Sequence, residues 1–183
     1  MAKRTKKNIT LGSGMLYHQE FTGTVPDVET ICQEANHVGW IKGGASLEYT
    51  MEKYEEKDDL GRVTKVITVS EEVLLKCGLL TWNGETLTKL TSRGVTTETD
   101  GKRVTKIGGS GNSNDTNYVW CFHYEDETDG DVWVLVVGQN QSGFTITFAS
   151  DAGTVLEPEI KAIPHDDAGT LVQFIEEIGT TTT

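Results

Sequence analysis

Apolar and polar residues alternate over long stretches of this chain, and that alternation constrains its fold more than any other feature. In the segment 46–52, the apolar side chains Leu47, Tyr49 and Met51 fall on one face and the polar residues on the other. The stretch 66–81, with Glu71 as the one polar exception, repeats the pattern at Val69, Val73, Leu75, Cys77 and Leu79. Because successive side chains of a strand point to opposite faces, both segments are predicted to be half-buried β-strands.

Further strand candidates are rich in Val, Ile, Thr and aromatic residues, which strands prefer. They are Lys102–Ile107, Tyr118–Tyr124, Val132–Val137, Phe144–Ala149, Thr154–Ala162 and Leu171–Ile175. Segments rich in Asp and Gly separate the candidates, at 58–61, 99–101, 129–131, 150–153 and 166–169. Short strands punctuated in this way predict a mainly β fold of sandwich or barrel type, and 183 residues suit a single domain spanning 1–183.

One short flanking helix is predicted after Asn83, which can cap it, with Leu87 and Leu90 at helical spacing before Gly94. Leu79 and Leu80 are the expected packing partners of this helix. A second apolar stripe at 28–35 suits a helix or an irregular strand equally well. The polar segment 108–117 is expected to be a flexible loop without phosphate-binding character, and the tail 179–183 to be disordered.

The chain is acidic, with 28 Asp and Glu against 16 Lys and Arg, a net charge of −12. Four of the basic residues lie in the N-terminal segment 1–10: Lys3, Arg4, Lys6 and Lys7. Residues 8–183 therefore carry 12 basic and 28 acidic side chains, a net charge of −16, which disfavours nucleic-acid binding by the body. The segment 1–10 is interpreted as a flexible basic arm, which is either a solvated tail or a contact to an acidic neighbour.

Composition also narrows the location of the chain. No apolar run approaches the roughly 20 residues that span a bilayer, and the basic N-terminus leads into no apolar signal segment. The three cysteines are too widely spaced for a zinc pair or a disulfide framework. We therefore expect no membrane association and a reducing compartment.

Catalytic constellations are not apparent in the sequence. The four histidines lack metal-ligand spacing, and the cysteines lie in apolar segments typical of inert packing thiols. Adjacent carboxylates such as Asp58-Asp59 and Asp166-Asp167 do not fix the separation that glycoside hydrolysis requires. The sequence therefore predicts a protein that is not an enzyme, with no cofactor and no metal.

Tryptophan supports a different alternative. Trp40, Trp82, Trp120 and Trp133 could form an exposed aromatic face, as in a carbohydrate-binding β-sandwich module. Equally, these rings could fill the core or a subunit interface, which their wide separation and strand-interior positions favour.

The segment 52–65 joins the two long alternating strands and carries both signs of charge in near balance. It is either a mobile solvated loop or a hairpin arm that reaches a neighbouring subunit, since mixed-sign pairs favour register and specificity. The candidate interface residues are Glu52, Tyr54, Glu55, Lys57, Asp58, Asp59, Leu60, Arg62 and Lys65.

Several short segments, in order along residues 36–178, together resemble one protein family. They are Gly39–Tyr49 continuing to Lys57–Gly61, Leu79–Leu90, Gly101–Arg103, Ile107–Gly109, Val136–Phe144 and Asp166–Val172. This series is similar to the tail tube (major tail) proteins of tailed phages that infect Gram-positive bacteria, and of related phage-tail-like particles. Residues 1–35 match less well.

The resemblance implies a β-sandwich protomer with one flanking helix, six of which form a ring, with rings stacked into a hollow tube in the virion tail. It implies that the hairpin 52–65 contacts other subunits and rings, and that the N-terminal arm helps to bridge rings. The implied partners are further copies of the chain, the tape measure, tail terminator and baseplate proteins, and a sheath in contractile tails. DNA would pass through the acidic lumen without specific binding, and assembly would take place in the cytoplasm of the bacterial host.

Overall fold

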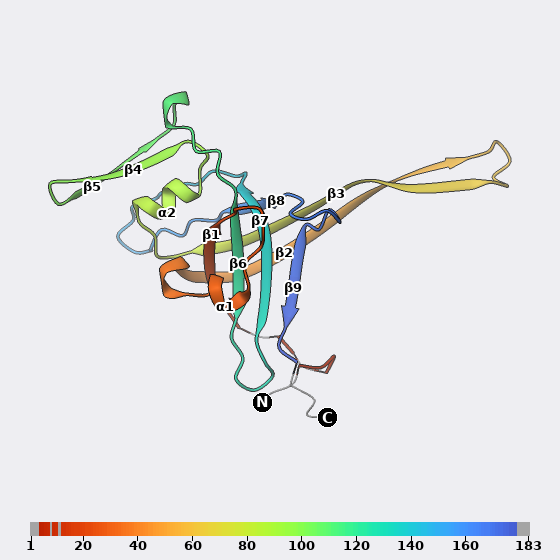
Figure 1. Cartoon of the computed structure of the whole chain (residues 1–183), viewed down its shortest axis with the longest axis horizontal. Coiled ribbons are helices and arrows are strands. Elements are labelled where there is room, and N and C mark those ends of the chain that lie inside the picture. The colour runs from red at the N-terminus through yellow and green to blue at the C-terminus, as the bar shows by residue number, and fades with distance from the viewer. Residues whose placement is uncertain (1–3, 8, 11, 179–183) are drawn as a thin grey trace.

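Antiparallel strands close into a barrel in the computed structural model, which describes residues 4–7, 9–10 and 12–178 (Figure 1). Around the barrel the order is β6 (Tyr118–Tyr124), β1 (Met15–Glu20), β2 (His37–Lys57), β3 (Thr64–Leu79), β8 (Glu159–Ala162) and β7 (Val132–Asn140). The barrel is closed because β7 also pairs with β6. A further strand, β9 (Val172–Glu176), pairs with the first half of β7. With 47% strand and 9% helix, the predicted mainly β fold is confirmed.

The remaining elements are small. A single helical turn, α1 (Val28–Ile31), and the 3₁₀ turn η1 (Glu34–Asn36) connect β1 to β2. After β3 come the helix α2 (Gly84–Lys89), a separate two-stranded sheet of β4 (Gly94–Thr99) and β5 (Lys102–Ile107), and the 3₁₀ turn η2 (Ser110–Asn112). The segment 28–35, for which the sequence left helix and strand open, is thus largely helical turns.

The strand predictions fared unevenly. Lys102–Ile107 and Tyr118–Tyr124 are strands with those bounds, whereas β7 runs three residues further than predicted, to Asn140. The predicted strand Phe144–Ala149 is wrong: its Phe144 and Ile146 pack on the core, but the segment joins no ladder. Of the predicted strand 154–162 only β8 remains, with one isolated bridge from Leu156 to Leu79. Strands β1 and β4 were not predicted.

The main core lies inside the barrel. Leu16, Leu75, Leu79, Trp120 and Ile160 are all fully buried in one cluster. The Trp120 ring nitrogen donates to the Gly138 carbonyl oxygen at 3.2 Å, so the buried indole loses no hydrogen bond. Of the two alternatives for the tryptophans, Trp120 takes the core position.

A second apolar cluster covers the outer face of the barrel wall. Tyr17, Val119, Cys121 and Leu135 point outward from β1, β6 and β7 and pack against Ile31 of α1. Both faces of β6 and β7 are therefore buried, which explains their nearly continuous apolar sequences.

Helix α2 packs on the barrel core, as its sequence predicted. The Asn83 side chain accepts hydrogen bonds from the backbone N–H groups of Glu85 and Thr86, at 2.9 and 3.0 Å. Leu87 and Leu90 are buried in the same cluster as Leu79. Leu80, the other expected partner, lies at the surface.

His18 is buried in the barrel wall without a hydrogen-bond partner for either ring nitrogen. Its ring stacks on Tyr118 at 5.6 Å and meets the edge of Trp120 at 5.7 Å. Burial lowers the pKa of His18 to about 4, and the positive charge of Lys89 adds to the effect. The folded state therefore favours the neutral ring.

The pH dependence of stability follows from this histidine. Because the pKa is lower in the folded state, the stabilisation is complete above about pH 6.5 and is lost as pH falls toward 4. We expect this residue to remove about 3 kcal/mol from the free energy of unfolding between pH 7 and pH 4. Urea unfolding of the wild type and of His18→Phe, which keeps an aromatic ring, measures the difference. Parallel pH curves for the two proteins would contradict it.

Candidate assembly surface

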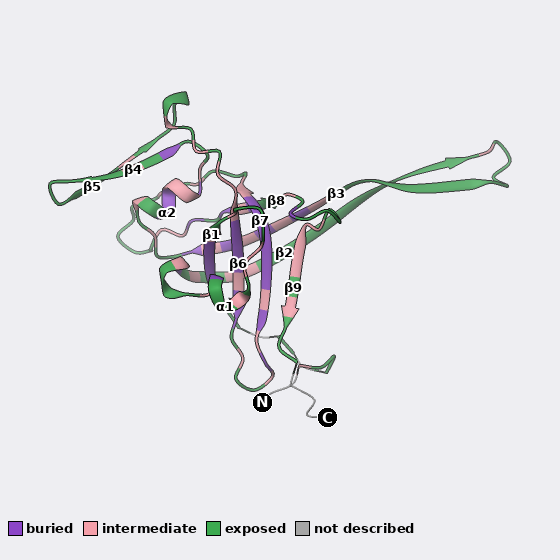
Figure 2. Cartoon of the chain, viewed as in Figure 1, coloured by how far each residue is buried: buried purple, intermediate pink, exposed green. Residues whose placement is uncertain are grey.

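The hairpin of β2 and β3 extends far beyond the barrel as a two-stranded arm (Figure 1). The strands pair from Ala45 with Cys77 out to Lys57 with Thr64, with one register shift between Glu52 and Lys53. Every residue in 46–57 and 64–71 is exposed, and Figure 2 shows this part as one green ribbon. We call residues 46–71 the arm. It is longer than the predicted hairpin 52–65, because the strands run through that segment and only 58–63 forms the turn.

An apolar stripe on the arm continues the face that forms the barrel core. Leu47 and Tyr49 lie directly across from Leu75 and Val73, which are buried, and Met51 follows on the same face. Yet Leu47, Tyr49 and Met51 are 39%, 52% and 43% exposed. The sequence predicted a half-buried strand here, and for the single chain this is wrong. In the described part of the chain, these three side chains are only partly covered.

A β-bulge divides the arm. Glu52 pairs with Ser70 and Lys53 with Thr68, so Val69 is an extra residue without a partner in β2. Beyond it the alternation of β3 is inverted, and Ile67, paired with Tyr54, lies on the face opposite Met51. Both faces of the outer arm therefore carry exposed apolar side chains.

Several charged residues proposed for the interface are occupied within the arm itself. Lys57 pairs with Glu55 at 3.0 Å, and Glu52 accepts from the Ser70 hydroxyl at 3.1 Å. Tyr54 donates to Glu56. Such exposed pairs contribute little to stability, but they leave the apolar stripe as the arm's larger unsatisfied surface.

Asp58 organises the turn at the tip of the arm. Its carboxylate accepts from the Val63 backbone N–H at 2.7 Å and faces Arg62 at 3.3 Å. The Val63 bond, with a smaller contribution from Arg62, holds the pKa of Asp58 below its usual value. Asp59 and Leu60 instead face solvent, Leu60 with 71% of its surface exposed. Asp58 and Arg62 thus have a structural role, and Asp59 and Leu60 are the better contact candidates.

The arm also presents unpaired backbone edges. Outside the β2–β3 ladder, β1 pairs with β2 only near residues 37–40, and β8 pairs with β3 only at 74–76. Free edges of long strands are ready to accept a strand from another chain. Lys65, the last residue of the candidate set, lies exposed on such an edge strand, opposite Glu56.

The N-terminal segment differs at Arg4 from the expected solvated arm. The Arg4 guanidinium donates to the Gly130 carbonyl oxygen at 2.8 Å and lies 3.5 Å from Glu176, with only 5% of its side chain exposed. It also lies 5.6 Å from the centre of the Tyr124 ring. Arg4 therefore fastens the segment to the barrel, while Lys6 and Lys7 are exposed. Lys3 lies outside the described residues, as does the predicted disordered tail 179–183.

A second hairpin lies on the opposite side of the barrel from the arm (Figure 1). Its strands β4 and β5 pair from Gly94 with Ile107 to Thr99 with Lys102. Arg103 joins the hairpin to α2 by contacting Glu98 at 2.7 Å and Glu85 at 3.1 Å. The turn signal at 99–101 and the predicted strand 102–107 were sufficient to indicate a partner strand before Asp100.

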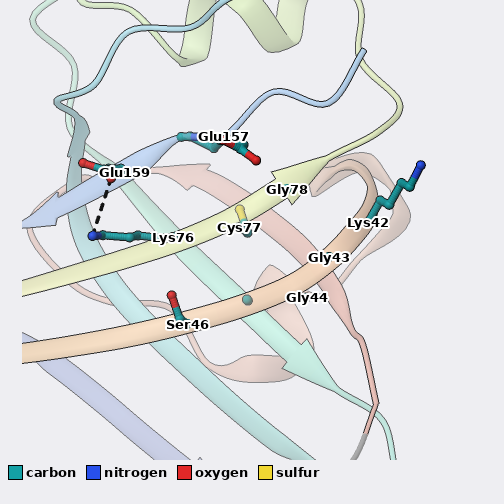
Figure 3. Close-up of a pocket in the computed structure, with 11 residues that line it drawn as sticks. Lys42, Gly43, Gly44, Ser46, Lys76, Cys77, Gly78, Glu157 and Glu159 are labelled. Carbon is teal, nitrogen blue, oxygen red and sulfur yellow. Dashed lines mark ion pairs between the residues drawn. The ribbon is translucent and has the colours of Figure 1, made fainter. Parts of the chain in front are cut away.

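The base of the arm contains a shallow depression of about 300 Å³, shown in Figure 3. Ile41 pairs with Leu79 and Ala45 with Cys77, so Lys42, Gly43 and Gly44 bulge out opposite Gly78 alone. Gly43 and Gly44 adopt positive φ angles of 90° and 82°, which only glycine accommodates readily. Two successive glycines inside a strand pattern were the signal for this bulge.

The depression holds no activated nucleophile. Burial raises the pKa of the Cys77 thiol to about 12. Lys76 lies 3.5 Å from Glu159, the ion pair marked in Figure 3. It also lies 3.0 Å from Glu48, and the hydrogen bond with Glu48 raises its pKa. Both groups are protonated at neutral pH. The prediction that the chain is not an enzyme stays a prediction.

The described residues contain no group of three or more His, Cys, Asp or Glu that could hold a metal ion. Over the same residues, no helix is long and apolar enough to cross a bilayer. Trp82 and Trp133 are half-buried, and Trp40 is 59% exposed beside His37. The aromatic platform of a carbohydrate-binding module is therefore reduced to one strongly exposed indole.

Comparison with known proteins adds no relative. No protein-family model matches the chain, and no curated protein matches it.

The turn at the tip gives a local test. Replacing Asp58 with Ala removes the acceptor for Val63 and Arg62, so the turn should open more often while the barrel stays folded. We expect trypsin to cleave after Arg62 roughly 2- to 10-fold faster than in the wild type. Asp59→Ala is the matched control and should cleave at the wild-type rate. Equal rates for the two variants would show that Asp58 does not hold the turn.

Proposed function

We propose that this chain is a structural protein that polymerises through its β2–β3 arm, as stacked hexameric rings of a phage-type tail tube. The observation that carries the proposal is the apolar stripe of Leu47, Tyr49 and Met51, which continues the core face outside the barrel. Large exposed apolar surfaces typically mark interfaces. The hexamer and the tube come from the sequence resemblance, and the arm supplies a physical means of assembly.

The expected low stability of the arm on its own supports the proposal that a partner subunit binds it. An isolated two-stranded hairpin is at best marginally stable in water. Over residues 52–69, the described strands pair only with each other. Docking on a neighbouring subunit would cover the apolar stripe and bury it, as the barrel core buries the same face of β3. The arm would then order fully only on assembly, which would slow premature polymerisation.

The charge of the chain suits a channel for DNA. With a net charge of −12, a ring of six copies would be strongly acidic. An acidic lumen repels phosphates over roughly 8–10 Å at physiological salt, so DNA could slide without sticking. On this proposal the protein is a virion component, assembled in the bacterial cytoplasm and joined there by tape measure, terminator and baseplate proteins.

Negative-stain electron microscopy with size-exclusion chromatography tests the proposal directly. We expect the purified chain, concentrated, to form six-fold rings or hollow tubes. Rings of another symmetry would reject the hexamer but keep arm-mediated assembly. A strict monomer at every concentration, also in the presence of preformed tube ends, would reject the proposal.

Substitutions at two adjacent residues distinguish the role of the apolar stripe from that of the opposite face of the arm. Met51→Lys places a cation on the stripe opposite Glu71, and Thr50→Lys places one on the other face opposite Glu72. Because burying a methionine contributes about 1.5–3 kcal/mol, Met51→Lys should raise the concentration needed for assembly by roughly 10-fold or more.

Thr50→Lys is the matched control and should assemble like the wild type, and circular dichroism should show both variants folded. Assembly of Met51→Lys at the wild-type concentration would exclude the stripe as the contact surface.

A carbohydrate-binding module is the second candidate, favoured by the exposed Trp40. Stacking on a sugar would quench its fluorescence, and Trp40→Ala would abolish binding. Glycan binding by a protein that remains monomeric would replace the tube proposal with this one.

A further inference from the structure

Two cysteines that are far apart in the sequence lie together on the outer face of the barrel. The sulfur atoms of Cys32 and Cys121 are 3.9 Å apart, across a sequence separation of 89 residues. Both are free thiols, and the third cysteine, Cys77, belongs to the separate cluster inside the barrel. The wide spacing that argued against a disulfide framework thus concealed a close pair.

We propose that Cys32 and Cys121 form an oxidation-responsive pair, which a small hydroperoxide converts into an intrachain disulfide that fastens residues 21–36 to the barrel wall. This site goes beyond the proposed assembly and does not depend on it.

The two thiols differ in burial, as expected if one reacts with the oxidant and the other only with its partner. Cys32 is half-buried and ends α1, where its backbone N–H donates to the Val28 carbonyl oxygen at 3.0 Å. Cys121 is fully buried in β6, between Tyr17 of β1 and Leu135 of β7. Cys32 is therefore the more accessible residue of the pair for a small oxidant, whereas Cys121 is shielded from solvent and lies against Cys32.

Hydrogen bonding divides the roles of attacking and resolving thiol. The hydrogen bond with Cys121 lowers the pKa of Cys32, and a further hydrogen bond from the Trp133 side chain acts in the same direction. The same bond and burial raise the pKa of Cys121. Partial burial of Cys32 and, to a smaller extent, nearby Glu29 and Glu125 act to raise this pKa, but the net shift remains downward. Cys32 is therefore the thiol more readily present as the thiolate, the reactive form.

The reaction balances with hydrogen peroxide as the oxidant. The Cys32 thiolate attacks one peroxide oxygen, the O–O bond breaks, and Cys32 becomes a sulfenic acid while hydroxide leaves. The Cys121 sulfur then attacks the Cys32 sulfur and displaces the hydroxyl group, which leaves as water with the thiol proton. Two thiols and one peroxide thus yield one disulfide and two waters, counting the proton that neutralises the hydroxide.

The movement required is small and falls on the side of the pair that lies outside the sheet. A disulfide needs a sulfur–sulfur distance of about 2.05 Å, so the atoms must approach from 3.9 Å. Cys121 is held by strands on both sides, but Cys32 ends a single helical turn outside the sheet. Rotation of the Cys32 side chain with a slight shift of α1 can supply the approach.

Intact-protein mass spectrometry tests the pair on the full chain. The protein is treated briefly with hydrogen peroxide and the peroxide is removed, after which we expect its mass to be lower by about 2 Da. It is then alkylated with N-ethylmaleimide in denaturant. We also expect one maleimide adduct instead of the three that the free cysteines of the reduced protein take up. Peptide mapping should locate the bond between Cys32 and Cys121, and dithiothreitol should reverse it.

Matched variants identify the participants. Cys77→Ala should still form the disulfide, whereas Cys32→Ser and Cys121→Val should not, and circular dichroism before oxidation verifies that each variant is folded. Sulfinic acid at Cys32 with Cys121 still free, or disulfide-linked dimers in place of the intrachain bond, would overturn the proposal.

The fastening of residues 21–36 has its own readout. A cross-link spanning 89 residues restricts the unfolded chain, so the oxidised protein should melt higher by on the order of 10 °C. Amide exchange in residues 21–36 should slow on oxidation and recover with dithiothreitol. Unchanged melting and unchanged exchange after complete oxidation would show that the bond fastens nothing.

Discussion

The ladder between β2 and β3 is the interaction on which the rest of this structure depends. The same two strands form part of the barrel wall near Ile41 and Leu79 and build the arm as far as Lys57 and Thr64. Inside the barrel the ladder is supported by β1, β8 and a filled core. Beyond Glu71, toward the turn, it pairs with no other strand of the described residues. The arm is therefore the part of the fold that receives the fewest packing and pairing contacts from its own chain. In the proposed assembly, a second copy would supply them.

One face of this ladder changes its role along its length. Leu75 and Val73 are buried in the core, while Leu47 and Tyr49 across from them face solvent. The face that β2 contributes stays apolar beyond the barrel rim, but its burial does not continue, as the change to exposed residues along the hairpin in Figure 2 shows. The charged side chains differ from the apolar ones, because many charges of the arm and of its base are already paired within the chain. Apolar burial, with charge setting register, is the physical basis of the proposed assembly.

The closed barrel explains how a chain with only 36% hydrophobic residues folds at all. Closure removes most strand edges from the body, and covering β6 and β7 on both faces makes efficient use of few apolar residues. The segment carrying α1 provides the outer cover, and it brings Cys32 to Cys121. Arg4 fastens a further part of the chain at Gly130 and Glu176. These peripheral contacts add stability where the core is thin.

Local periodicity by itself determined the mainly β fold, the long strands of the hairpin and the cap of α2 at Asn83, because alternation and capping depend on neighbouring residues. It could not determine that Phe144–Ala149 lacks a ladder partner, that Val69 forms a bulge, or that Leu47 faces water. Those outcomes depend on which segments lie beside a strand and above its face. The meeting of Cys32 with Cys121 was likewise decided only by the tertiary structure. Asp58 lies in the segment 58–61 that the sequence indicated as a turn, the structure adds its hydrogen bond from Val63, and its role as a contact residue stays a prediction. Pairing partners and covering layers come from distant parts of the chain, and alternation within one segment carries no record of them.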